Sequence, residues 1–292
     1  MWKAIEQSIS EATGEAFAVL SAVPVSGGCI NEAVCLTGEK QRFFVKLNHP
    51  NRLQLFACEA AGLTAILGSN CLRAPRPVCH GISESQSFLA LEFIEMIPPR
   101  DQTSLALGEQ LAAMHRHTGS SFGWESDNYI GTTHQHNLQT AYWIDFLRDQ
   151  RIGFQLALAQ SNGAPPALFD RGQRLLQELP ALFSGYQPVA SLLHGDLWGG
   201  NWGCATDNSP VIFDPAVYYG DREADIAMTE LFGGFDDRFY QSYRHAWTLD
   251  PGYSSRKVLY NLYHILNHYN LFGGGYAGQA LGMIDCLISE IS

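Results

Sequence analysis

The segment from His194 to Asn201 contains residue types that can carry out phosphoryl transfer. Asp196 supplies a carboxylate, Asn201 follows with an amide, and a further carboxylate, Asp214, comes directly after the apolar run 211–213. A kinase needs one Asp that accepts the proton of the attacking hydroxyl, an amide oxygen that holds a metal ion, and a second Asp that bridges the metal to the nucleotide phosphates. Asp196, Asn201 and Asp214 fit these three roles in order.

The spacing of these residues is similar to that of the protein-kinase catalytic loop, in which an Asn follows the catalytic Asp at this interval and a metal-binding Asp ends a short hairpin. Residues 203–213 predict such a hairpin, because 207–210 is a turn-forming sequence between two apolar stretches. His194 would then support the loop that carries Asp196. For the His-Gly-Asp triplet taken alone, the alternative is a turn closed by Asx hydrogen bonds.

Lys46 is a second candidate, since it is flanked by Phe44, Val45 and Leu47 in a predicted strand. A charged group in a mostly buried strand needs a carboxylate or a phosphate partner. Glu59 can be that partner, because 55–63 reads as a helix directly after the strand, as in kinases that pair a helix Glu with a strand Lys. The alternative is a surface Lys and a solvated Glu.

The turn around Gly27, Gly28 and Cys29 lies between two predicted strands, and glycines there allow backbone amides to approach phosphate oxygens. We therefore predict a nucleotide-binding loop, although a plain hairpin turn has the same sequence pattern. For Cys29, a small buried thiol is one interpretation. The other is an exposed thiol whose oxidation blocks the nucleotide, so that peroxide inactivates the protein and ATP protects it.

The segment around Glu92 and Ile94 separates a strand-rich part from a helix-rich part. We predict an N-terminal lobe at 1–95 and a C-terminal lobe at 96–292. In a two-lobed kinase this connector lies along the adenine, and the backbone of Glu92 and Ile94 would bond to the adenine edge.

Hydrophobic periodicity predicts the elements around these residues. Strands are expected at 18–25, 33–36, 43–47, 78–82, 87–94 and 189–193, and helices at 3–14, 55–63, 107–114, 143–159, from 221 onward, 259–266 and 284–291. The first five strands form one predicted sheet. Asp225 lies in the first turn of the helix that starts at 221, where an acidic side chain suits the helix dipole. Its role is either to stabilise the start of this helix or to support the catalytic loop.

Composition excludes some classes of function. A formal net charge of −11, from 18 basic and 29 acidic residues, argues against a nucleic-acid partner and is compatible with a cationic substrate. The seven cysteines form no Cys-x-x-Cys pair, which indicates reduced thiols rather than zinc ligands. We find neither a signal peptide nor an apolar run long enough to cross a membrane. We therefore expect a cytoplasmic protein with no membrane partner.

Taken together, these motifs resemble those of the fructosamine kinase (ketosamine 3-kinase) family of the bacterial type, within the aminoglycoside phosphotransferase-like group. Trp198, which follows the catalytic Asp by two residues, is among the features that narrow the resemblance to this family. The other segments that carry it extend over most of the chain: 27–32, 44–46, 128–131, 194–201, 213–216, 219–223, 232–235, 263–268 and 271–274.

The resemblance implies an α+β, protein-kinase-like bilobal fold, with a five-stranded antiparallel sheet and helices in the N-terminal lobe and a mainly helical C-terminal lobe. It implies ATP-dependent phosphorylation of the C3 hydroxyl of a ketosamine, free or bound to protein. The 3-phosphate products of the family shed the sugar, so the role would be deglycation. Asp196 would be the base, Asn201 and Asp214 the Mg²⁺ ligands, Lys46 the phosphate-binding residue and Glu59 its ion-pair partner.

Three other functions compete with this interpretation. A protein kinase is disfavoured, because the helix start at 221–225 leaves no room for an activation loop after Asp214. An aminoglycoside or choline kinase would suit the charge balance equally well. In that context Trp198 would stack on a sugar or cover an amine, unless it is simply core packing. The third competing function is an inactive binding module, although the presence of all four proposed catalytic and binding residues argues against it: Lys46, Asp196, Asn201 and Asp214. We expect a monomer or a weak homodimer.

Overall fold

The computed structural model describes residues 2–25 and 31–291. The chain divides into two compact units, Met1–Thr103 with Trp202–Pro215, and Ser104–Asn201 with Ala216–Ser292. It therefore passes from one unit to the other after Thr103, Asn201 and Pro215. The units differ from the predicted lobes 1–95 and 96–292 chiefly because 202–215 belongs with the N-terminal part.

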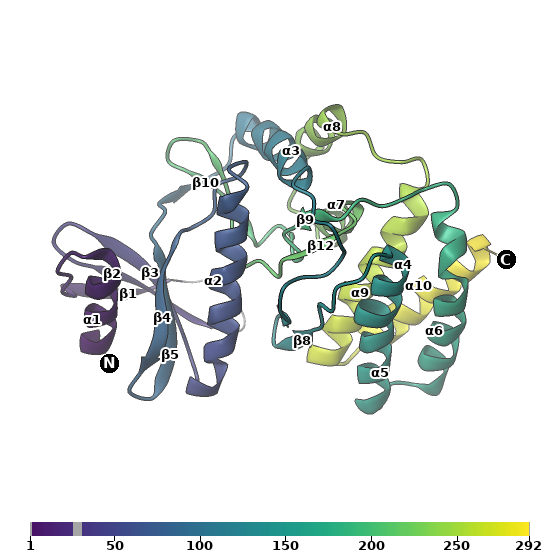
Figure 1. Ribbon diagram of the computed structural model, residues 1–292, viewed down its shortest axis with the longest axis horizontal. Coiled ribbons are helices and arrows are strands. Elements are labelled where there is room, and N and C mark those ends of the chain that lie inside the picture. Colours follow the sequence, from purple (N-terminus) through teal and green to yellow (C-terminus); the bar gives the residue numbers. More distant parts are fainter. Residues whose placement is uncertain (1, 26–30, 292) are drawn as a thin grey trace. The chain divides into compact units, whose positions relative to one another are not determined.

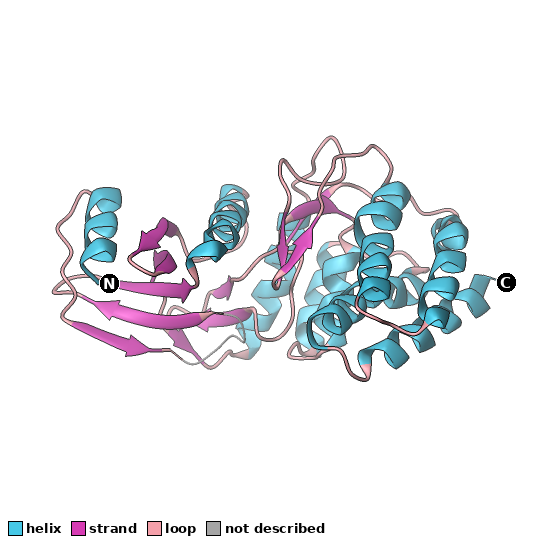
Figure 2. Ribbon diagram, turned by 90° about the horizontal axis from the view of Figure 1, so that it is seen from below, coloured by secondary structure: helices cyan, strands magenta, loops and turns pink. Residues whose placement is uncertain are grey.

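The first unit contains a strand-rich part (Figure 2). Its five-stranded sheet has the order β1-β2-β3-β5-β4, and every neighbouring pair is antiparallel. The strands are β1 (Ser21–Pro24), β2 (Glu32–Thr37), β3 (Arg42–Asn48), β4 (Pro77–Ser83) and β5 (Gln86–Glu92). This confirms the predicted five-stranded antiparallel sheet. The first strand is shorter than expected because it is the exposed edge of the sheet, and all four of its residues are exposed.

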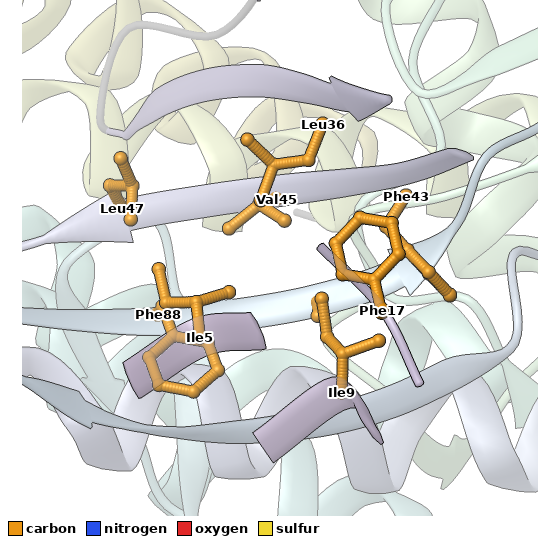
Figure 3. Close-up of a cluster of buried hydrophobic side chains, with 9 residues drawn as sticks. Ile5, Ile9, Phe17, Leu36, Phe43, Val45, Leu47 and Phe88 are labelled. Atoms are coloured by element: carbon orange, nitrogen blue, oxygen red, sulfur yellow. The ribbon is translucent and has the colours of Figure 1, made fainter. Parts of the chain in front are cut away.

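Two helices, α1 (Trp2–Thr13) and α2 (Leu53–Gly68), cover opposite faces of this sheet (Figure 1). A short 3₁₀ turn, η1 (Pro50–Arg52), leads into α2. Alternation along β3 explains the two faces, because successive side chains of a strand point to opposite sides. Val45 and Leu47 join the core under α1, which Figure 3 shows with Ile5 and Ile9. Lys46 therefore points to the α2 face.

A hairpin from later in the chain completes this unit. Its strands β10 (Trp202–Ala205) and β11 (Pro210–Ile212) form a small sheet with β6 (Met96–Ile97), in the order β11-β10-β6. Cys204 pairs with Ile97 and Ala205 with Met96. This pairing is the physical reason that the hairpin belongs to the first unit.

The second unit is mainly helical, and α5, α6, α9 and α10 lie side by side (Figure 1). Its helices are α3 (Asp101–His115, whose first residues belong to the first unit), α4 (Trp143–Phe146), η2 (Leu147–Ile152), α5 (Gly153–Ser161), α6 (Pro166–Glu178), η3 (Leu179–Phe183), α7 (Glu223–Leu231), α8 (Asp237–Ala246), α9 (Tyr253–Phe272) and α10 (Tyr276–Ile291). Two two-stranded sheets pair β7 (Asn128–Ile130) with β8 (Thr133–Gln135), and β9 (Ser191–Leu193) with β12 (Tyr218–Gly220).

The helix predicted at 143–159 is interrupted by the π-helical segment η2. Arg151 lies in this segment with only 1% of its surface exposed. Its guanidinium donates to Asn137 Oδ1 at 2.7 Å and lies 4.1 Å from the Tyr218 ring centre. A π-helical turn is wider than an α-helical turn, and here it occurs where a charged side chain points into the protein interior.

None of the helices within the described ranges is both long and apolar enough to cross a membrane.

Candidate active site

Lys46 is the centre of a charged cluster in the first unit. The residue is 5% exposed, and its Nζ donates to Glu59 Oε1 at 2.6 Å and also to Asp214 Oδ1. Strand β3 supplies the Lys, helix α2 supplies the Glu, and the residue that follows β11 by two positions supplies the Asp. Three separate elements thus hold one ammonium group between two carboxylates.

Burial and charge act in opposite directions on the pKa values of this cluster. Burial would lower the pKa of Lys46, but the Asp214 and Glu59 carboxylates outweigh it and raise that pKa above its usual value. Burial raises the pKa of Glu59 to about 7, because the loss of water outweighs the attraction of the Lys46 ammonium. Lys46 is therefore firmly cationic, whereas Glu59 changes its charge near neutral pH.

The backbone at Asp214 has a φ of 59°, in the left-handed region that side-chain-bearing residues rarely adopt. Such a conformation persists only where the surrounding structure enforces it, and it is common at functional sites. The hairpin that delivers Asp214 is anchored through Arg73, whose carbonyl accepts from the Ile212 amide at 3.0 Å. The Arg73 guanidinium also reaches Asp207 at 3.3 Å and Glu92 at 3.6 Å.

In the second unit, strand β9 leads directly into the loop 194–201. Gly195 is required in this loop, since its φ is +82° and a Cβ there would lie 2.1 Å from the Ala216 carbonyl oxygen. The Ala216 amide donates to the His194 carbonyl at 2.8 Å. The strand predicted at 189–193 begins only at Ser191, because Val189 is 49% exposed and outside the pairing with β12.

Asp225, in the first turn of α7, supports this loop through hydrogen bonds. Its Oδ2 accepts from the His194 amide at 2.7 Å, and its Oδ1 accepts from the Gly195 amide at 2.8 Å. Burial would raise the pKa of Asp225, but hydrogen bonds from His115 and from the Gly195 amide, together with the nearby His194, lower it below its usual value. The ionised carboxylate is thus the form that the fold stabilises.

Two residues that the sequence pattern did not single out, His115 and Tyr243, hold Asp225 in turn. His115 Nε2 lies 3.1 Å from Asp225 Oδ2, and His115 Nδ1 lies 2.8 Å from the Tyr243 hydroxyl. His115 is fully buried at the end of α3. The signal in the sequence is a histidine that directly follows the apolar positions of a predicted helix, because such a residue is expected to be buried and to need a polar partner.

Asp196 and Asn201 lie at the two ends of the same tight loop. The Asn201 side-chain nitrogen donates to the Asp196 carbonyl at 2.8 Å and to Asp196 Oδ2 at 3.3 Å. Asn201 is 5% exposed, and Asp196 is half-buried. Because the amide nitrogen is committed to Asp196, the amide oxygen is the group that Asn201 offers to a cation.

Trp198 lies between these two residues and is 41% exposed. Its ring covers Gly200, where a Cβ would lie 2.3 Å from the indole. The interpretation of Trp198 as core packing is therefore wrong, and its ring is accessible to a ligand.

The predicted adenine contacts are only partly available. The Glu92 amide donates to the Arg76 carbonyl at 2.8 Å, so it is already occupied within the first unit. Ile94 follows β5, outside the sheet ladder. Gly27, Gly28 and Cys29 lie outside the described residues.

The candidate residues thus form two groups. Lys46, Glu59 and Asp214 belong to the first unit, whereas Asp196 and Asn201 belong to the second. The first group can bind phosphate and metal, and the second can accept a proton and offer an amide oxygen.

Comparisons with known proteins give a consistent result. A probable ketoamine kinase from Synechocystis is 47% identical to this chain over 291 residues, which cover 98% of this chain and 97% of that protein. The chloroplastic protein-ribulosamine 3-kinase of Oryza sativa subsp. indica is 43% identical over 275 residues, which cover 93% and 80% of the two chains.

Solved structures support the fold. A candidate fructosamine-3-kinase from Haemophilus somnus superimposes with a TM-score of 0.89 at 30% identity, over 99% of this chain and 98% of that one. An aminoglycoside phosphotransferase, solved with ADP and hygromycin B, shares the fold with a TM-score of 0.65 at 16% identity, over 98% of both chains. This likeness confirms the α+β, protein-kinase-like bilobal fold. The fructosamine kinase family model matches residues 1–290, and the chain therefore belongs to the fructosamine kinase family.

Proposed function

We propose that this protein transfers the γ-phosphoryl group of ATP to the C3 hydroxyl of a ketosamine. The observation that carries the proposal is the family match over residues 1–290. The charged cluster at Lys46 and the loop 194–201 supply the groups that this reaction needs. Removal of the sugar from the unstable 3-phosphate would make the protein a deglycating enzyme. The name of the rice relative, a protein-ribulosamine 3-kinase, supports a ketosamine 3-phosphate as the product.

Lys46 would bind the phosphates of ATP. Its ammonium is held between Glu59 and Asp214, which fixes its position before a nucleotide arrives. A preorganised cation stabilises the charge on the transferring group without the cost of reorganising water. Glu59 acts as a positioning residue, because it holds the ammonium from the side of α2.

Asp196 would accept the proton of the C3 hydroxyl as that oxygen attacks phosphorus. The hydrogen bond from Asn201 orients one carboxylate oxygen of Asp196. Asp225 fixes the loop backbone through two amides. Asp196 would thus act on the acceptor hydroxyl, whereas Lys46 would act on the phosphates of ATP.

The residues present suit Mg²⁺, which prefers oxygen ligands. The Asp214 side chain is 41% exposed, so its carboxylate can reach a cation. The amide oxygen of Asn201 is the second candidate ligand. The ion would neutralise phosphate charge when it is bound.

Trp198 would contact the substrate. Its exposed indole can cover the cationic amine of a ketosamine or stack on its sugar. We propose that the substrate is a ribulose- or fructose-derived adduct of an amine, free or on a protein. The six free cysteines among the described residues are consistent with a reducing compartment such as the cytoplasm. We propose that the protein works there as a monomer or a weak homodimer.

The proposal is tested by ADP release from the purified protein with ATP and Mg²⁺. The acceptors are ribuloselysine, fructoselysine, kanamycin and choline, and the control omits the acceptor. We expect acceptor-dependent ADP release with at least one ketosamine and only background with the other two compounds.

Two results would contradict the proposal in different ways. Turnover of kanamycin or choline, but of neither ketosamine, would show that the substrate is an aminoglycoside or choline and not a ketosamine. Binding of ATP without any turnover would indicate an inactive nucleotide-binding module.

A further inference from the structure

The hairpin of β7 and β8 in the second unit brings two histidines and one carboxylate together. Tyr129 pairs with His134, and Asn128 pairs with Gln135. Residues on a strand alternate between its faces, and directly paired residues share a face. Asp127 precedes β7 and His136 follows β8, so both lie on the face that carries His134.

The opposite face of this hairpin is buried and firmly attached. The Asn128 side chain donates to the Val217 carbonyl at 2.8 Å, and the Gln135 side chain donates to the Ala216 carbonyl at 3.1 Å. The Tyr263 hydroxyl donates to the Gln135 side chain at 2.7 Å. The face with the histidines is therefore presented from a rigid base.

Two of the distances among the three side chains are close to those between ligands of one metal ion. Asp127 Oδ2 lies 3.0 Å from His136 Nδ1 and 3.6 Å from His134 Nε2. The three ligand atoms all lie within 4.8 Å of one another. Metal–nitrogen bonds of about 2.0 Å in a tetrahedral site place the ligand atoms roughly 3.3 Å apart. The geometry thus needs only a small adjustment to surround an ion.

The surroundings also fix the three groups in orientation. Asp127 Oδ1 accepts from the Asn137 amide at 2.8 Å, which leaves Oδ2 facing the two imidazoles. The His136 ring packs edge-on against Phe154 at 4.8 Å, and the His134 ring packs edge-on against Tyr129 at 5.5 Å. Such supporting contacts hold metal ligands in their productive geometry.

We propose that Asp127, His134 and His136 form a binding site for Zn²⁺ or a similar divalent transition metal. Two imidazoles and a carboxylate favour this class over Mg²⁺, which prefers oxygen ligands. The side chains of all three residues are 40 to 43% exposed, so an ion enters from solvent and the fourth position is open to water or an anion. None of these three residues has a role in the proposed phosphoryl transfer, and the proposed metal site does not depend on that function.

The test is a Zn²⁺ titration of the nucleotide-free protein against a chromophoric chelator. Excess Mg²⁺ competes with Zn²⁺ for oxygen ligands such as those proposed at Asp214 and Asn201, and a Cys286→Ser background removes the exposed cysteine. The variants are His134→Gln and His136→Gln, and the matched control is His80→Gln, an exposed histidine on β4. We expect one tight equivalent in the parent and control, and a loss of affinity of at least about tenfold in each site variant.

Thermal unfolding gives an independent readout, because an ion that binds only the folded state stabilises it. Zn²⁺ should raise the melting temperature of the parent and of His80→Gln, and not that of His134→Gln. His134 has no part in the buried face of the hairpin, so its variant should fold normally in the absence of metal. Equal Zn²⁺ affinity in the parent and in His134→Gln would overturn the proposal.

Discussion

At Lys46 a single ammonium group holds two carboxylates that differ in exposure. The Glu59 side chain is 14% exposed and that of Asp214 is 41% exposed. Asp214 is thus the carboxylate that can turn toward a metal, whereas Glu59 stays with the Lys. The difference in exposure therefore favours a positioning role for Glu59 and a metal-binding role for Asp214.

The pKa of about 7 at Glu59 predicts a pH effect on activity. The ionised carboxylate is needed to hold Lys46, so kcat/KM should rise as the pH passes through about 7. Stability should move in the opposite direction, because a raised carboxyl pKa makes the folded state bind the extra proton below that value. Stability from this group falls as the pH rises from the usual value of about 4 to about 7.

The variant Glu59→Gln tests this relation. It should lose the rise of kcat/KM near pH 7 and have an increased KM for ATP, which pH-dependent steady-state kinetics would measure. If kcat/KM of Glu59→Gln still rises near pH 7, the rise is caused by the ionisation of another group.

Replacement of the proposed base should separate chemistry from binding. Asp196→Asn keeps the size of the side chain but cannot accept the proton, so kcat should fall by at least about a hundredfold. The Kd for ATP, measured by calorimetry, should change little. A variant that retains more than a tenth of the parental kcat would show that Asp196 is not the base.

At the scale of elements, Asp225 joins α7 to the loop 194–201 and, through His115, to α3. An amide in its place can accept from only one of the two loop amides and directs its NH₂ group at the other. Asp225→Asn should therefore lower the free energy of unfolding by about 2–4 kcal/mol at neutral pH. Asp237→Asn, at an exposed position of α8, is the control.

The pH dependence of this stabilisation has a definite sign. Because the pKa of Asp225 is lowered in the folded state, its contribution is complete above the unfolded value of about 4 and is lost as the pH falls through the folded value. Denaturant unfolding should show that the deficit of Asp225→Asn shrinks in acid. A deficit that is equal at neutral and acid pH would contradict the ionised brace.

Gly195 gives a second prediction for the same loop. Alanine at this position is strained by the positive φ and by its approach to the Ala216 carbonyl oxygen. Gly195→Ala should displace Asp196 and reduce kcat by at least about tenfold, since small displacements of catalytic groups cost one to two orders of magnitude. Gly185→Ala, which also has positive φ but no neighbour within 4 Å, controls for backbone strain alone.

Local patterns predicted some of these elements well and others poorly. The strand with Lys46 and the helix with Glu59 follow from apolar periodicity, which is a local signal. The placement of the 202–215 hairpin in the first unit rests on two-residue pairing with β6, more than a hundred positions away in sequence. The partnership of His115 with Asp225 spans 110 positions. Such long-range contacts leave little trace in the local pattern.

For the whole molecule, the net charge of −11 creates a field that attracts cations. A glycated peptide with net positive charge should therefore react with a kcat/KM that falls several-fold as salt is raised from low to about 0.3 M, because salt screens the field. A glycated acidic peptide of the same length should show a weaker or reversed dependence. Equal salt dependence of both peptides in initial-rate assays would argue against steering by the protein charge.

The central claim, that phosphate is transferred to C3 of a ketosamine with Asp196 as the base, is tested most directly on the product. The reaction uses ATP, Mg²⁺ and the ¹³C-labelled ketosamine that the ADP-release assay identifies, and ³¹P–¹³C coupling in NMR spectra locates the phosphate. The account predicts coupling to C3 with the parent protein and a product signal reduced by at least about a hundredfold with Asp196→Asn. Coupling to a set of carbons other than C3 and its direct neighbours C2 and C4, or equal product from Asp196→Asn, would contradict it.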